Sequence, residues 1–64
     1  MTAEQAIRTV RAIRFEPKPT LSSIARAAGI SRVTLYEVIN SGKATDAVAQ
    51  ALARGLQAVQ VRPY

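Results

Sequence analysis

The sequence predicts an all-α fold, a compact domain of four helices whose central pair forms a helix-turn-helix. Two observations carry this prediction. Apolar residues recur at spacings of three and four in four runs, and each run starts near a Thr or Ser that can cap a helix. Within Thr20–Gly42, two of these runs are separated only by a tight turn at Gly29, so two short helices must cross steeply there.

The first helix is expected over Ala3–Phe15, with Thr2 as its N-cap and Glu4 where the helix dipole favours an acidic group. Its apolar stripe consists of Ala3, Ala6, Ile7, Val10 and Ile13. Arg8 and Arg11 lie away from that stripe, where they either contact phosphate or form a solvated face. Of these two alternatives we favour the solvated face.

The segment Glu16–Pro19 ends the first helix, because a residue before proline avoids the helical conformation and two prolines stiffen the link. Phe15, the single phenylalanine of the chain, is expected to close the core beneath this link. Lys18 lies just before the next helix, where free backbone amides attract anions, and is therefore a candidate phosphate contact.

Local signals delimit the two central helices. Thr20 and Ser31 are the predicted N-caps, and Gly29 stops the first helix by adopting a positive φ. The buried faces are expected to consist of Leu21, Ile24, Ala25 and Ala28 in the first helix, and of Thr34, Leu35, Val38 and Ile39 in the second. The opposite side of the second helix carries Arg32, Val33, Tyr36, Glu37 and Asn40. Asn40, Ser41 and Gly42 provide its stop.

A fourth helix is expected from the N-cap Thr45 to about Ala58, packing back on the first helix. Its helical-period positions are Val48, Ala51, Leu52, Gly55, Leu56 and Val59. Gly55 weakens the helix slightly and is expected to permit a close approach of another helix. Residues Ala58–Tyr64 alternate apolar and polar, which leaves two alternatives: a short C-terminal β-strand that pairs with its twin in a dimer, or a frayed terminus.

Composition excludes several function classes. The chain of 64 residues, predicted to form one domain over 1–64, has no cysteine or histidine, so no disulfide, metal or cofactor is expected. Its carboxylates fall on separate elements and no glycine-rich phosphate loop occurs, which argues against an enzyme. No apolar run approaches the ~20 residues of a membrane span and no signal peptide is evident, so we expect a cytoplasmic protein, nucleoid-associated when bound.

The charge balance points to a polyanionic partner. Nine Lys and Arg against four Asp and Glu give a formal net charge of +5 and a sequence pI near 10.9. Such a balance on a small domain is typical of nucleic-acid binding, although many small basic proteins bind no nucleic acid. Charge alone therefore does not establish DNA as the partner.

The stretch Thr20–Gly42 resembles the helix-turn-helix of the Cro-like and phage-repressor-like DNA-binding proteins, with the lac-repressor type headpiece as a near relative. The family has a small residue four positions before the turn glycine, here Ala25 before Gly29, and aliphatic residues six and nine positions after it. The matching aliphatic positions are Ile24, Ala28, Ile30, Leu35 and Val38. The match covers about 25 residues closely and, through the order of helices, most of the chain loosely.

The resemblance implies a base-reading surface on the second helix of the motif, formed by Ser31, Arg32, Val33, Tyr36, Glu37 and Asn40. It implies phosphate contacts near the start of the first helix and in the loop after the second, with Lys18, Thr20, Ser22, Ser23 and Lys43 as candidates. The family often opens the first helix of the motif with a Gln that contacts a phosphate, where this chain has Leu21. Backbone amides and Ser22 or Ser23 must therefore make that phosphate contact. Arg32 is the strongest base-reading candidate, because arginine bonds guanine in bidentate fashion.

Three of these residues have structural alternatives. Tyr36 either touches DNA or only covers the rim of the core. Asn40 either touches DNA or serves as the C-cap of its helix. Glu37 either accepts a hydrogen bond from a base or is a solvated residue, alone or paired with a nearby arginine.

The expected function is that of a sequence-specific DNA-binding regulator, a small repressor or autorepressor that binds double-stranded DNA as a homodimer on an inverted repeat. The resemblance suits a phage or plasmid regulator, and no small-molecule effector is expected. Two other functions stay open. One is a protein-interaction module such as an antitoxin or antiactivator, and the other is a DNA-bending accessory factor of recombination.

Overall fold

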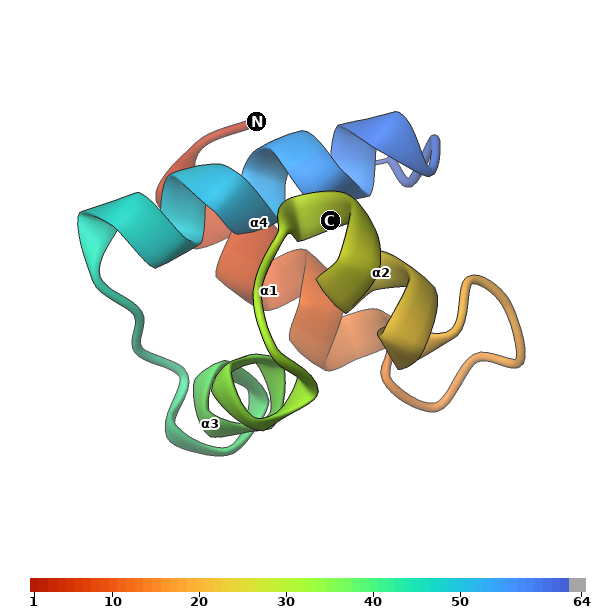
Figure 1. Cartoon of the computed structure of the whole chain (residues 1–64), viewed down its shortest axis with the longest axis horizontal. Helices are drawn as coiled ribbons and strands as arrows, with labels where there is room; N and C mark the ends of the chain where they lie inside the picture. The colour runs from red at the N-terminus through yellow and green to blue at the C-terminus, as the bar shows by residue number, and fades with distance from the viewer. Residues whose placement is uncertain (63–64) are drawn as a thin grey trace.

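A computed structural model describes residues 1–62, which form four α-helices and no strand (Figure 1). The helices are α1 (Ala3–Ile13), α2 (Leu21–Ala28), α3 (Arg32–Ser41) and α4 (Asp46–Ala58). Both α1 and α2 pack against α4, and α3 packs against α1 and α2. The predicted all-helical fold and its order of helices are confirmed. No helix within residues 1–62 has both the length and the apolar character needed to cross a membrane.

Every helix begins at a hydroxyl N-cap. Thr2, Thr20, Ser31 and Thr45 each accept a hydrogen bond from the backbone N–H three residues further on, over distances of 3.1 to 3.3 Å. In α1 the cap is reciprocal, because the Gln5 side chain accepts from the Thr2 backbone N–H at 2.9 Å. Each cap contributes about 1 kcal/mol, so all four predicted helix starts have a local energetic cause.

The glycines that end α2 and α3 also act through hydrogen bonds to nearby residues. Gly29 has φ 73° and forms a Schellman motif, in which its own N–H donates to Arg26 and the N–H of Ile30 donates to Ala25. Gly42 has φ 71° and its N–H donates to the Val38 carbonyl at 2.8 Å. Asn40 therefore is not the C-cap of α3, and one of the two alternatives for this residue is removed.

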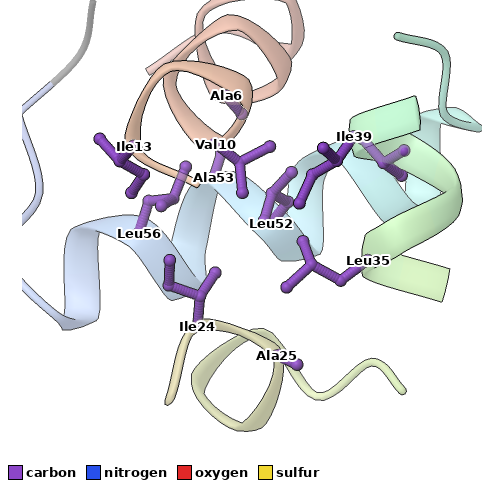
Figure 2. Packing of buried hydrophobic residues seen from close by; sticks show 11 residues of the cluster. Ala6, Val10, Ile13, Ile24, Ala25, Leu35, Ile39, Leu52, Ala53 and Leu56 are labelled. Carbon is purple, nitrogen blue, oxygen red and sulfur yellow. The ribbon is translucent and has the colours of Figure 1, made fainter. Parts of the chain in front are cut away.

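The core lies where all four helices meet. Figure 2 shows side chains of α1, α2 and α3 converging on α4, and the largest fully buried apolar ones are Val10, Ile24, Leu35, Leu52 and Leu56. The core positions predicted for the helix-turn-helix are confirmed at Ile24, Ala25, Leu35 and Val38. Few large side chains are involved, so the stability of the fold depends on close contact between helices.

Helices α2 and α4 come into close contact at Gly55. A Cβ added at Gly55 would lie 2.7 Å from both the Cβ and the backbone nitrogen of Ala28, and 2.8 Å from its Cα. The close approach expected at Gly55 is thus confirmed, and the helix that approaches is α2. Backbone atoms form most of this contact and cannot rotate away as a side chain can, so a Cβ at Gly55 would force the two helices apart.

The prediction that Phe15 closes the core is wrong. Helix α1 ends at Ile13, two residues earlier than expected, and Phe15 is 82% exposed with the Arg14 guanidinium carbon 4.6 Å from its ring centroid. The reason is the path of the chain: Arg14 keeps the helical angles φ −58° and ψ −22°, so residue 15 lies about 200° around the axis from Ile13, away from the face that Ala6, Val10 and Ile13 bury. Phe15 therefore points away from the core.

Of the two alternatives left open for Ala58–Tyr64, the strand finds no support, because residues 58–62 form none; Pro63 and Tyr64 lie outside the described residues. Gln60 adopts φ 62°, and a Schellman motif ends α4: the Gln60 N–H donates to Gln57 at 3.0 Å and the Val61 N–H to Leu56 at 2.9 Å. Val59 and Val61 both pack against the core. The apolar alternation that suggested a strand therefore has another cause: Val59 and Val61 pack on the core on either side of Gln60, whose φ is left-handed.

Replacing Gln60 with glycine should stabilise the protein by about 0.5–1 kcal/mol, because a residue with a Cβ is strained at positive φ and glycine is not. Urea unfolding measures this free energy. The control is Gln57→Gly on the exposed side of α4, where helical φ makes glycine cost about 1 kcal/mol. A Gln60→Gly protein that is less stable than the parent would contradict the prediction.

Candidate nucleic-acid interface

The outward side of α3 carries the residues that the sequence assigned to base reading. Leu35, Val38 and Ile39 are buried in the core, where α3 packs against α1 and α2, which leaves the opposite side of the helix in solvent. We call this side the α3 outer face and define it by Val33, Tyr36, Glu37 and Asn40, all of which are exposed. Val33 is 68% and Tyr36 is 46% exposed, so this side of α3 presents two large apolar side chains to solvent.

Two hollows border the α3 outer face. The first has a volume of about 340 Å³ and is lined by Arg14, Phe15, Leu21, Tyr36, Ile39 and Asn40. The second has a volume of about 400 Å³ and is lined by Thr34, Glu37, Val38, Ser41, Lys43, Ala44, Thr45 and Val48. One cationic residue therefore lies on each flank of α3, Arg14 from the link after α1 and Lys43 from the loop before α4.

Both alternatives that the sequence left for Tyr36 are compatible with its position, at the rim of the core and partly exposed. It shares the first hollow with Leu21 and Ile39, of which Ile39 belongs to the core, so the ring covers part of the core rim. Nearly half of its surface is nevertheless accessible to a ligand of α3.

The first turns of α2 and α3 lie together. Arg32 donates from Nη1 to the Ser22 hydroxyl at 3.3 Å, and the Thr20 hydroxyl donates to Ser23 Oγ at 2.9 Å. The structure thus places Arg32 beside Ser22, one of the candidate phosphate ligands at the start of α2, a pairing that their sequence positions do not reveal. The 3.3 Å bond is long for an N–H···O contact and both groups are exposed, so little free energy is needed to exchange it.

Two candidates have a different setting from the rest. Ser31 is engaged in its own helix: its Oγ accepts from the Thr34 N–H at 3.1 Å and bonds Thr34 Oγ1 at 2.9 Å. Lys18 lines a third hollow with Glu16, Gln60 and Arg62, near the end of α4, and the two hollows beside α3 do not include it. The structure therefore does not bring Lys18 onto the flanks of the α3 outer face.

Sequence reasoning missed Arg14 and Phe15 as neighbours of α3, and it did not place Arg11, which it had weighed as a phosphate contact, at the end of that helix. Arg14 and Phe15 border α3, and Arg11 contacts its C-terminal end, where a Cβ added at Gly42 would lie 2.7 Å from Arg11 Nη1. The helical period could have revealed the outward direction of Phe15. No local pattern could have paired Arg11 with Gly42, because helix packing brings these distant residues together.

Residues 1–62 contain no group of three His, Cys, Asp or Glu side chains arranged to hold a metal ion. Comparison with protein-family models, curated proteins and solved structures finds no match to this chain. The resemblance to Cro-like proteins therefore stays a prediction. The function has to be inferred from the geometry of the helices and from the charge of the chain.

Proposed function

We propose that this protein is a sequence-specific DNA-binding regulator that inserts α3 into the major groove of double-stranded DNA. The observation that carries the proposal is the α3 outer face, an exposed helix side with a cationic residue in the hollow on each flank. A helix with its side chains is about 10–12 Å wide and matches a groove about 12 Å wide. The net charge of +5 supplies the attraction to the duplex.

Each residue of the interface has a definite task in this proposal. Arg32 exchanges its bond to Ser22 for a bidentate contact with guanine, Val33 packs on a thymine methyl group, and Glu37 accepts from a cytosine amino group. Arg14 and Lys43 approach the phosphates on the two sides of the groove. Base contacts then select the site, while the flanking cations supply affinity.

The proposal includes a homodimer on an inverted repeat. One α3 spans only a few base pairs, and two copies about one helical turn of DNA apart raise affinity and selectivity together. Within residues 1–62, the large apolar side chains that are exposed lie on α3 and in the link after α1. Helix α4 therefore offers no such side chain to a dimer interface. Bound at a promoter, such a dimer would act as a repressor.

Selection of binding sites from random duplex DNA tests this function, followed by affinity measurements at increasing salt. We expect an enriched motif with two-fold symmetry, because a dimer presents α3 twice. We also expect affinity to fall ~10³-fold between about 50 and 200 mM salt, as about six phosphate contacts require. No enriched motif, or an affinity that salt leaves unchanged, would contradict the proposal.

A protein-binding module is the second candidate. Phe15 at 82% exposed and Val33 at 68% exposed provide apolar surface of the kind that protein partners bury. Such a module would bind a protein with little dependence on salt and would show no sequence preference for DNA. The same salt titration therefore separates the two functions.

A further inference from the structure

Three arginines follow α1 and its C-cap at intervals of three residues: Arg8 and Arg11 in the helix and Arg14 at the cap, which we call the α1 arginine row. All three are exposed, and together they line a hollow of about 540 Å³ with Glu4, Ile7, Ala12 and Gly42. From the first arginine to the last, the helix rises about 9 Å. The sequence alone favoured a solvated face for the first two.

Packing connects the α1 arginine row to α3. Arg11 Nη1 lies against the backbone at the end of α3, since a Cβ added at Gly42 would come within 2.7 Å of it. Helix C-termini carry partial negative charge, so a guanidinium is stabilised at this position. Lys43, the next residue of the chain, adds a further cation beside the same helix end.

Arg14 makes the row continuous with the α3 outer face. It lines the α1 hollow together with Arg8 and Arg11, and it also lines the hollow that contains Tyr36 and Asn40. A strand of DNA that leaves the α3 outer face on this side therefore meets Arg14 first and the rest of the row next.

We propose that the α1 arginine row binds the sugar-phosphate backbone of the same DNA duplex whose bases α3 reads. The inference rests on the proposed function and adds to it a contact surface on α1. One strand of DNA carries a charge about every 3.4 Å of axis, and neighbouring phosphates lie farther apart along the winding backbone, so a row about 9 Å long can meet about two of them. The guanidinium fork binds phosphate oxygens in bidentate geometry.

The test compares two double variants with the parent protein. The variant Arg8→Gln/Arg14→Gln, called the row variant, retains the contact of Arg11 with the end of α3. The control, Arg26→Gln/Arg54→Gln, removes the same charge from exposed positions of α2 and α4 that line neither hollow. Circular dichroism melting checks that both variants fold.

Affinity is measured against salt for the selected duplex and for a scrambled duplex. The row variant should lower the slope of log K against log salt by about 2, because each lost phosphate contact removes ~0.9 from it. Both duplexes should lose affinity by the same factor, which leaves sequence preference unchanged. The control variant should keep the slope of the parent.

Three results would overturn the inference in distinguishable ways. Equal slopes for the row variant and the control would remove the α1 site together with the phosphate contact of Arg14, and would leave base reading by α3 intact. A parent protein that binds neither duplex would remove the proposed function and the inference with it. If poly-glutamate binds the parent as tightly as the duplex does and the row variant loses that binding, the α1 arginine row is a site for acidic proteins.

Discussion

Arg32→Ala is expected to cost about 1–3 kcal/mol of discrimination between the selected DNA site and a scrambled one, which is roughly a 5- to 150-fold loss of preference. A bidentate arginine–guanine contact specifies a base, and alanine offers nothing in its place. The fold should remain intact, because Arg32 is exposed and its bond to Ser22 joins two exposed groups. Affinities for the two duplexes at one salt concentration measure the effect.

Two further variants define what Arg32 contributes. Arg32→Lys keeps the charge without the fork, so it should lose sequence preference and keep the salt dependence of binding. Ser22→Ala removes the hydrogen-bond partner of the guanidinium and should leave sequence preference unchanged. Full discrimination by Arg32→Ala would show that other residues of α3 read the site.

Gly55→Ala is expected to lower the free energy of unfolding by about 1–3 kcal/mol, although alanine favours a helix by about 1 kcal/mol over glycine. The added Cβ would lie 2.7 Å from the backbone nitrogen of Ala28, so α2 and α4 must separate. A chain of 64 residues has a total stability of roughly 3–10 kcal/mol, and such a loss is a large part of it.

Urea unfolding measures the free energy of unfolding of Gly55→Ala and of the double variant Gly55→Ala/Ala28→Gly. The comparison tests whether the loss comes from contact with Ala28. Removing the Cβ of Ala28 relieves one of the three close contacts and should recover part of the stability, because the backbone nitrogen and Cα remain. Gln57→Ala, an exposed change on the same helix, should shift stability by less than about 0.5 kcal/mol. A Gly55→Ala protein more stable than the parent would contradict the close contact.

The candidate site divides into a part that the sequence predicts and a part that it does not. Helical periodicity separates Leu35 and Val38 from Val33, Tyr36 and Asn40, so the spacing of apolar residues is enough to predict the α3 outer face. The partners of that face could not be predicted in this way. Arg14 and Phe15 border α3 only because α1 packs beside it, and the bond between Arg32 and Ser22 depends on the crossing of α2 and α3.

The sequence by itself determined where the helices begin and where the central pair turns. Its caps and stops at Thr20, Gly29, Ser31 and Gly42 act through bonds to residues three to five positions away, so local chemistry is sufficient. Tertiary structure alone decided that α2 is the helix in contact at Gly55, that Val59 and Val61 pack on the core, and that the arginines of α1 lie beside α3. These outcomes depend on contacts between distant residues, which no local periodicity encodes.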